Sequence, residues 1–263
     1  MIKTQVLVIG SGPGGYTAAF RAADLGKEVV LVEKYKTLGG VCLNVGCIPS
    51  KSLLHTAQII NEAKHASQLG ISFGNTKIDI DGVKKNKESI VNKLTGGIQA
   101  LAKARKVKVV TGHAKFLSKN QVGLEGTDEV IEFEHCIIAA GSRVTKLPMF
   151  PFNDERVMDS TDALMLDDIP KRLLVVGGGI IGLEMATIYD ALGSEITIVE
   201  LESQIIPAAD KDIVSPLLKR IKKNYANIFL NTKVTKMTAS KKGIKVNFEG
   251  KDASKTDTFD KVL

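Results

Sequence analysis

The stretch VLVIGSGPGG, from Val6 to Gly15, is an apolar run that leads directly into a glycine-rich turn. A stretch of the same kind, LLVVGGGIIG, runs from Leu173 to Gly182. Each is followed by a second apolar run, VVLVE in the first copy and ITIVE in the second, which ends on Glu33 or Glu200. Both glutamates come 23 positions after the first glycine of their turn. The repeat predicts two units built alike, each with a strand, a turn, a helix and a second strand.

The three glycines of each turn have separate physical reasons. The first permits a tight turn, the second lets a pyrophosphate approach the backbone, and the third lets the helix pack closely on the strand. Amide groups at the start of the helix are then available to phosphate oxygens, and the carboxylate after the second strand can accept hydrogen bonds from ribose hydroxyls. These glycines are Gly10, Gly12 and Gly15 in the first copy and Gly177, Gly179 and Gly182 in the second. The repeat therefore predicts two dinucleotide sites.

The predicted fold is α/β, with two Rossmann-like dinucleotide-binding domains over 1–147 and 148–263. Each is expected to be a parallel sheet with helices plus a small antiparallel β insert. Between the repeats, apolar residues at helical spacing predict helices over 52–70 and 82–104. Short β-like runs follow, and two prolines mark a linker before the second repeat. The β-like runs span 107–117, 121–126 and 129–142, and the linker spans 146–157.

Two cysteines lie five positions apart in GGVCLNVGCIPSK, which runs from Gly39 to Lys51. In a regular helix that spacing gives about 7.5 Å of axial rise, beyond the Cα separation of about 6.8 Å that a relaxed disulfide spans. A bridge between Cys42 and Cys47 therefore requires a distorted backbone, which Gly46 and Asn44 can supply. Strained disulfides are the more oxidising kind, which favours redox chemistry. Two reduced core thiols are the alternative.

Other features of the sequence limit the possible roles of the cysteines. Neither a second cysteine pair nor a histidine pair at ligand spacing is present in the sequence to complete a zinc site. Pro49, just after Cys47, suits the first turn of a helix because its missing amide donor is not needed there. The third cysteine, Cys136, lies in the apolar run EHCIIAAG and is expected to pack in a buried strand.

Composition and charge exclude several classes of function. The 263 residues are 44% hydrophobic and 25% charged, which are globular values, and no apolar run approaches the roughly 18 residues needed to cross a bilayer. The first five residues lead directly into a strand, so neither a signal peptide nor a membrane anchor is expected, and the predicted location is cytoplasmic. The formal charge is +7, and the lysine clusters lack interleaved aromatic residues. That pattern favours a solvated helix face over a nucleic-acid surface.

With these parts in view, the chain resembles the flavin-dependent disulfide oxidoreductases, and among them most closely the bacterial dihydrolipoamide dehydrogenases. The resemblance spans the whole chain and rests on the two glycine-rich turns, CLNVGCIPSK, IIAAGS, and the LEMA that follows the second turn. CLNVGCIPSK is the most specific of these motifs. Mercuric reductases share a similar cysteine segment and are the nearest rival. The resemblance implies that the first unit binds FAD and the second binds NAD.

The resemblance also implies a role for each residue of a redox centre. Cys42 would be the thiol that meets a lipoyl dithiol, and Cys47 the thiol that lies against the flavin. Lys51, one helical turn after Cys47, would stabilise negative charge on the reduced flavin and on the Cys47 thiolate. Glu184, just after the second glycine-rich turn, would be the partner of that lysine. The alternatives are an exposed lysine at a helix start and an acid favoured by the helix dipole.

Two sets of cofactor contacts are implied in the same way. The FAD set is Gly10, Gly12, Gly14, Gly15, Glu33, Lys34, Gly39, Gly40, Val41, Lys51, Ala114, Ala140, Gly141 and Ser142. The NAD set is Gly177, Gly178, Gly179, Ile180, Ile181, Gly182, Glu200 and Val234. Val234 fits a plain buried strand position equally well. Glu200 is followed by Leu201 and Glu202, with no Arg or Lys before Pro207. A 2′-phosphate would meet negative charge there, so NAD is favoured over NADP.

The family supplies the base for thiol exchange as a histidine with a supporting glutamate, from the C-terminal domain of the partner subunit. None of the four histidines here lies in that motif, and the chain stops at FDKVL. They are His55, His65, His113 and His135. We therefore expect a fragment, truncated before the interface domain, with little or no dehydrogenase activity. The full-length protein is expected to be a homodimer that serves the lipoyl-bearing acyltransferase of a 2-oxoacid dehydrogenase complex. A non-catalytic cofactor-binding module is the alternative.

Overall fold

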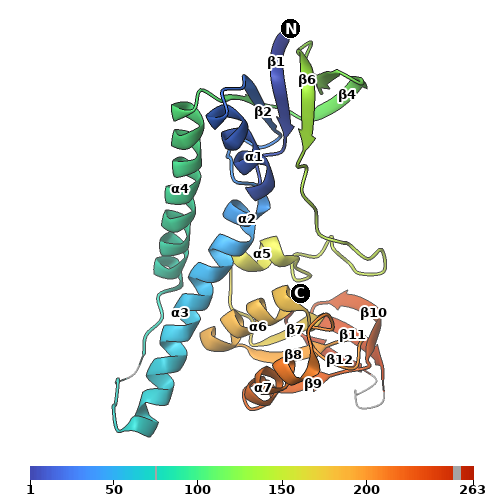
Figure 1. The fold of residues 1–263 in the computed structure, drawn as a ribbon. Coiled ribbons are helices and arrows are strands. Elements are labelled where there is room, and N and C mark those ends of the chain that lie inside the picture. The colour runs from blue at the N-terminus through green and yellow to red at the C-terminus, as the bar shows by residue number, and fades with distance from the viewer. Residues whose placement is uncertain (75, 251–255) are drawn as a thin grey trace. The chain divides into compact units, whose positions relative to one another are not determined.

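The structure, a computed structural model, describes residues 1–74, 76–250 and 256–263. The chain divides into two compact units, both drawn in Figure 1. The first unit is Met1–Pro49 with Asn86–Arg143, and the second is Ser50–Lys85 with Val144–Leu263. The second unit thus takes residues 50–85 as well as the C-terminal part of the chain. The functional domains expected over 1–147 and 148–263 stay a prediction.

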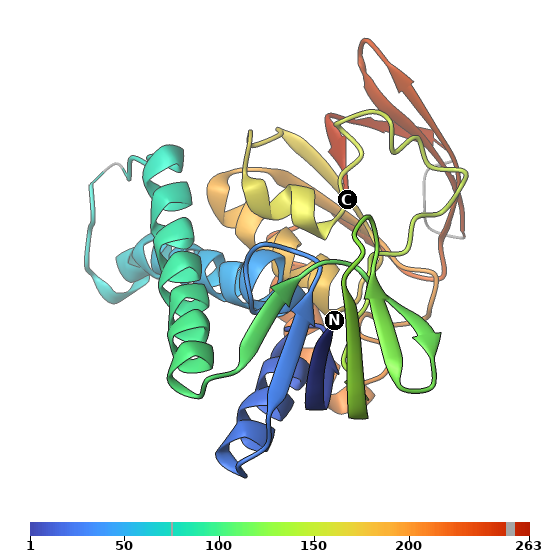
Figure 2. The same ribbon diagram turned by 90° about the horizontal axis from the view of Figure 1, so that it is seen from above.

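The first unit is built on one six-stranded sheet, whose strand order is β3-β2-β1-β6-β5-β4 (Figure 2). The pairs β1 with β2, β1 with β6, and β2 with β3 are parallel, whereas β5 runs antiparallel to both of its neighbours, β4 and β6. The strands are β1 Ile2–Ile9, β2 Val29–Glu33, β3 Lys108–Thr111, β4 Ala114–Ser118, β5 Gln121–Leu124 and β6 Val130–Ile138. The predicted antiparallel insert is therefore present, as an extension of the parallel sheet.

Helices cover one face of the first sheet. The helices that begin, end or lie in this unit are α1 Pro13–Asp24, α2 Gly40–Val45, α3 Cys47–His65 and α4 Ile80–Ala104. One core cluster joins β1 and β2 to α1 and α4, and includes Val8, Ala19, Leu31 and Ala102. All five residues of β2 are buried. A strand buried on both faces reads as a continuous apolar run, which is why VVLV carries no polar alternation.

The elements between the repeats differ in detail from the predictions. The helix expected over 52–70 begins earlier, at Cys47, and after His65 it tightens into the 3₁₀ helix η1 Ala66–Leu69. The helix expected over 82–104 begins at Ile80. The run 107–117, expected as one β-like stretch, is two strands, because the chain leaves the parallel edge of the sheet after Thr111 and returns antiparallel from Ala114.

Among its described residues, the second unit has two sheets. A four-stranded parallel sheet has the order β13-β7-β8-β9, and a three-stranded antiparallel sheet has the order β10-β11-β12. The parallel strands are β7 Arg172–Val176, β8 Glu195–Val199, β9 Asn227–Phe229 and β13 Lys261–Val262. The antiparallel strands are β10 Lys233–Ser240, β11 Gly243–Glu249 and β12 Thr256–Phe259. The helices after residue 144 are α5 Ser160–Met165, α6 Ile180–Leu192 and α7 Lys211–Ile221.

The parallel sheet of the second unit is covered on both faces. On one face Leu173 and Ile196 pack with side chains of α5, α6 and α7. On the other, Leu174 and Val199 pack with the antiparallel sheet. Phe150 and Phe152, from the segment predicted as a linker, pack against this second cluster. In the part of the chain that the structure describes, no helix is long and apolar enough to cross a membrane.

Candidate functional site

The first glycine-rich turn joins the end of β1 to the start of α1 (Figure 1). Gly10 has a φ of +94°, a backbone conformation that favours glycine. A Cβ atom on Gly15 would lie 1.8 Å from the carbonyl oxygen of Gly10. Only a residue without a side chain lets α1 approach the turn this closely, so the reason predicted for the third glycine is confirmed in this copy.

The second turn repeats this geometry between β7 and α6. Gly177 has a φ of +109°, and a Cβ atom on Gly182 would lie 2.3 Å from the Gly177 carbonyl oxygen. The helix α6 starts after Gly179, just as α1 starts after Gly12. Both turns lie at the carboxyl ends of parallel strands, which is where open α/β sheets bind ligands.

The helix starts at both turns leave their first amide groups without a side-chain acceptor. Gly12 and Gly179 are the N-cap residues, neither helix has a side-chain cap, and neither has an acid in its first turn. In contrast, Asp159 caps α5 by accepting hydrogen bonds from two backbone amides. Uncapped amides at the positive end of a helix dipole suit an anion. The turns therefore fit the pyrophosphate of a dinucleotide.

Glu33, at the end of β2, ties that strand to the first turn. Its carboxylate is buried and accepts hydrogen bonds from the Ser11 amide at 2.8 Å, the Ser11 hydroxyl at 2.6 Å and the Tyr35 amide at 3.1 Å. An ionised carboxylate has about four acceptor positions. Three are used, so Glu33 keeps room for one further donor, such as a ribose hydroxyl.

Ser11 is a residue that the sequence reasoning missed. It is fully buried, and besides donating to Glu33 it accepts from the Gly39 amide, through its carbonyl oxygen at 3.0 Å and its hydroxyl at 3.3 Å. One residue thus links the turn, the Glu33 carboxylate and the start of the cysteine segment. In the sequence, the sign of this role was the hydroxyl of Ser11, which lies between the first two glycines of GSGPGG. The glycine motif does not specify the residue at that position.

Glu200 has the corresponding place in the second unit, with fewer partners. Its carboxylate is buried and accepts from the Gly178 amide at 2.7 Å and from the Glu202 amide at 2.8 Å. The second copy has glycine where the first has Ser11, so the extra hydroxyl is missing. Two acceptor positions of Glu200 remain for a ligand, against one for Glu33.

The cysteine segment has the break that its spacing predicted. Cys42 lies in α2, Cys47 begins α3, and Gly46 between them has φ −144° and ψ −117°. A Cβ atom there would lie 2.8 Å from the Val41 carbonyl oxygen. The expectation that Asn44 also helps to distort the backbone was wrong, because this residue stays in α2.

The side-chain amide of Asn44 explains why that residue stays helical. It donates to the carbonyl oxygens of Leu38 and Gly40, at 3.1 and 2.9 Å, and so ties down the start of α2. The cysteine thiols on either side of the break are not equally accessible. Cys42 is half-buried and Cys47 is exposed.

Lys51 and Glu184 meet, as the resemblance implied. The Lys51 ammonium donates to Glu184 Oε1 at 2.6 Å, and the Ser50 hydroxyl donates to Glu184 Oε2 at the same distance. The three residues lie within the second unit, where α3 presents two consecutive donors to one carboxylate on α6. Ser50 was not predicted, because its partner is 134 positions away in the sequence.

The remaining predicted contacts fall into exposed and buried groups. Gly14, Lys34 and Val41 are exposed in the first unit, Ala114 is half-buried, and Ile180 and Ile181 are exposed at the start of α6. Gly39 and Gly40 begin α2 with positive φ, whereas Ala140, Gly141 and Ser142 are exposed after β6. Val234 is buried in the core of the antiparallel sheet, which agrees with its alternative as a plain packing residue.

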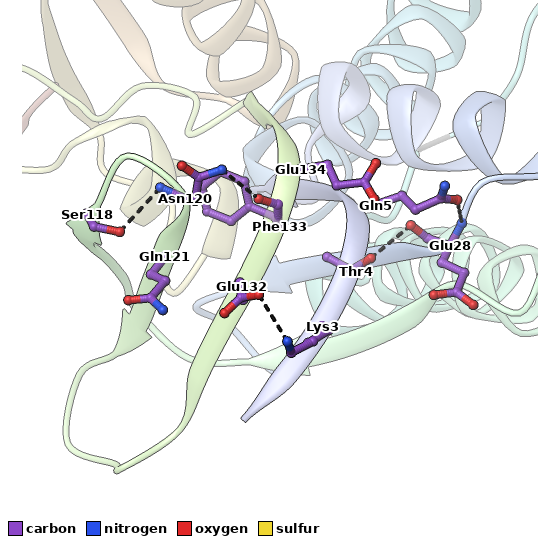
Figure 3. Close-up of a pocket in the computed structure, with 10 residues that line it drawn as sticks. All are labelled: Lys3, Thr4, Gln5, Glu28, Ser118, Asn120, Gln121, Glu132, Phe133 and Glu134. Carbon is purple, nitrogen blue, oxygen red and sulfur yellow. Dashed lines mark hydrogen bonds and ion pairs between the residues drawn. The ribbon is translucent and has the colours of Figure 1, made fainter.

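An open depression of about 540 Å³ lies at the opposite end of the parallel strands of the first sheet (Figure 3). It is lined by residues near the amino ends of β1, β2 and β6 and by residues around the turn between β4 and β5, and several of these residues bond to each other. Lys3 pairs with Glu132 at 3.2 Å, and the Thr4 hydroxyl donates to the Glu28 carbonyl at 2.8 Å. Parallel strands present ligand sites at their carboxyl ends, so this depression is not the nucleotide site.

The family model for pyridine nucleotide-disulphide oxidoreductases matches residues 4–260 of this chain. The chain belongs to this oxidoreductase family. The resemblance read from the cysteine segment and the two turns is confirmed, and so is the fold class.

Curated relatives in the oxidoreductase family are similar over the whole chain. Dihydrolipoyl dehydrogenase of Haemophilus influenzae is 54% identical over 265 residues, which cover 100% of this chain and 55% of that protein. Dihydrolipoyl dehydrogenase of Bacillus subtilis is 46% identical, with coverage of 100% and 56%. The chain is thus a homologue of dihydrolipoyl dehydrogenase that spans about half the length of these relatives.

Solved structures in the family have the same fold. The HOCl-induced flavoprotein disulfide reductase RclA of Escherichia coli, in its Cu(II) complex, matches with a TM-score of 0.84 and 28% identity. That match covers 100% of this chain and 56% of the reductase. A second structure of the same reductase matches with a TM-score of 0.82.

The reactivity of the thiols gives one test of the site. Burial raises the pKa of the Cys136 thiol above its ordinary value of 9.0, and only the thiolate is alkylated rapidly. After reduction of the protein with a thiol-free reductant, we expect iodoacetamide at pH 8 to modify the exposed Cys47 first and Cys136 more slowly, because burial leaves less of the Cys136 thiol ionised. The Cys136 rate should continue to rise at a pH where an ordinary thiol has levelled off. Peptide mass spectrometry over time measures both rates, and equal rates would contradict the burial argument.

Proposed function

We propose that this chain is the cofactor-binding part of a dihydrolipoyl dehydrogenase. The first unit would hold FAD on the turn after β1, and the second would hold NAD on the turn after β7. The observation that carries the proposal is the repeated arrangement of turn and carboxylate, Ser11 with Glu33 and Gly178 with Glu200, in a chain that also has the Gly46 break between two cysteines.

The residues of the cysteine segment suit the chemistry of a dithiol substrate. A lipoyl dithiolate would attack Cys42 in a Cys42–Cys47 disulfide and release the Cys47 thiolate, and the second substrate sulfur would then release Cys42. The substrate leaves as a disulfide, and the two cysteines hold the two electrons as a dithiol pair. When bound, FAD would take these electrons from the cysteine pair and pass them as a hydride to NAD⁺.

Lys51 and the helix geometry support the role proposed for Cys47. Cys47 is the first residue of α3. Lys51 follows one helical turn later in the same helix, which is the spacing that the resemblance implies for these two residues. The exposure of Cys47 leaves its sulfur accessible to a flavin.

Charge around Glu200 supports NAD over NADP. The Glu200 carboxylate is held by the Gly178 and Glu202 amides and keeps two acceptor positions for ribose hydroxyls. A 2′-phosphate in place of a hydroxyl would remove a donor and bring a like charge to a buried carboxylate. The lipoyl-bearing acyltransferase of a 2-oxoacid dehydrogenase complex is the proposed partner. A homodimer is proposed for a protein of the relatives' full length.

Reconstitution of the 263-residue chain tests the proposal. We expect the protein to bind FAD and turn yellow, and we expect NADH to reduce the flavin where NADPH does not. Lipoamide turnover should be lower than that of a full-length relative by about 100-fold or more, the usual contribution of a positioned base. Failure to bind FAD, or equal reduction by both nucleotides, would contradict the proposal. Reduction of Hg(II) in place of lipoamide would favour a mercuric reductase.

A further inference from the structure

Ser50 and Lys51 donate to the two oxygens of one carboxylate. The Ser50 hydroxyl reaches Glu184 Oε2 and the Lys51 ammonium reaches Glu184 Oε1, each at 2.6 Å. Their surroundings differ. Ser50 is 3% exposed, whereas the Lys51 side chain is 60% exposed and the Glu184 side chain 19% exposed. The serine bond is therefore shielded from water, and the ammonium faces solvent.

This difference in burial determines which of the two donors, Ser50 or Lys51, binds the Glu184 carboxylate more strongly. A hydrogen bond from a neutral donor to a charged acceptor changes the unfolding equilibrium by about tenfold or more. An ion pair with an exposed lysine is screened by water and salt, and changes it by at most about fivefold. Lysine also has more rotamer entropy to lose than serine. The Ser50 hydroxyl is thus the stronger anchor of Glu184.

We propose that Ser50 is a positioning residue that fixes the Glu184 carboxylate independently of Lys51. The Lys51 ammonium can then leave Glu184 without releasing the carboxylate, and can return to an acceptor that has not moved. The anchoring concerns Ser50, Lys51 and Glu184 alone, all within the second unit, so it does not rest on the proposed function.

Double-mutant cycles in the full chain without FAD test the anchoring. The variants are Ser50→Ala, Lys51→Met and Glu184→Ala, each made alone, with each of the first two also combined with Glu184→Ala. The Ser50–Glu184 cycle is repeated in the Lys51→Met background, and the measurement is urea unfolding at low and high salt. We expect the coupling between Ser50 and Glu184 to be about tenfold in the unfolding equilibrium constant and independent of salt. The coupling between Lys51 and Glu184 should be no more than about fivefold and should shrink as salt rises.

A conservative variant distinguishes hydrogen bonding by the Ser50 hydroxyl from a role of Ser50 in packing alone. Ser50→Thr keeps the hydroxyl and adds a methyl group at a buried position, so a role in packing alone predicts that threonine destabilises more than alanine. The proposal predicts that Ser50→Thr recovers most of the coupling with Glu184 that Ser50→Ala loses. If threonine does not fold, the alanine cycle alone still gives the coupling.

Two outcomes would overturn the proposal. The first is a Lys51–Glu184 coupling larger than that of Ser50–Glu184, and the second is a Ser50–Glu184 coupling that disappears in the Lys51→Met background. Because these measurements use protein without flavin, they are independent of the cofactor. A chain that fails to bind FAD but shows the expected cycle would contradict the proposed function and leave the anchoring intact.

Discussion

Replacing Cys47 by serine is expected to abolish the long-wavelength absorption band that we expect NADH to produce in the FAD-loaded chain. Such a band arises when a thiolate lies against an oxidised flavin, and Cys47 is the thiol that we place there. Serine has nearly the same size but its hydroxyl stays protonated at neutral pH, so no anionic donor remains. The measurement is an absorption spectrum during anaerobic titration with NADH, and the expected effect is loss of the whole band.

Two matched variants make the Cys47 result specific. Without Cys42 no disulfide can form with Cys47, so the Cys42→Ser variant should show the band before any NADH is added. The Cys136→Ser variant should behave as the unchanged protein does, because Cys136 is half-buried in β6, away from the cysteine segment in the sequence. A band that survives in Cys47→Ser, or that is lost in Cys136→Ser, would show that the thiol roles are wrongly assigned.

The parts of the site that the sequence predicted are those that depend on local backbone geometry. The closeness of Gly15 to Gly10, and of Gly182 to Gly177, follows from a strand, a turn and a helix that are contiguous in the chain. The break at Gly46 followed from the reach of a disulfide measured against helical rise. In each case the physical constraint acts over a few residues, and a motif of fixed spacing expresses it.

The parts that were missed depend on partners distant in sequence. Ser50 contacts Glu184 and Ser11 contacts Glu33 only once the fold is complete, and a serine in a motif gives no sign of its acceptor. Asn44 was misread for a related reason. Its amide can favour a turn, but here it donates to two carbonyl oxygens at the start of α2 and keeps the residue helical.

The division of the chain into two units could also not be predicted from the spacing of apolar residues alone. Residues 50–85 lie with the second unit, because apolar side chains on α3 and α4, such as Leu53 and Val83, pack in the same cluster as Leu183. Periodicity showed that these segments are helices with an apolar face, but it does not say which sheet or helix receives that face.

Replacing Gly15 by alanine is expected to destabilise the first unit and to remove FAD binding. The new Cβ atom would lie 1.8 Å from the Gly10 carbonyl oxygen and 2.8 Å from its carbon, so the backbone of α1 or of the turn must move. Neither α1 nor the strand before the turn can move freely, because Ala19 in α1 and Val8 in β1 are fully buried among packed neighbours. We expect a loss of about 3 kcal/mol, which lowers the melting temperature by roughly 6–12 °C, as measured by circular dichroism.

The neighbouring Gly14→Ala variant is the control for the Gly15 prediction, since it adds the same methyl group one residue earlier in the same helix. Apart from its chain neighbours and the backbone of its own helix, a Cβ atom at Gly14 would meet no atom within 4 Å, and alanine favours a helix over glycine by up to about 1 kcal/mol. Gly14→Ala should therefore melt at or slightly above the temperature of the unchanged protein. If both variants melt alike, the close approach of α1 to the Gly10 carbonyl is not what requires glycine at position 15.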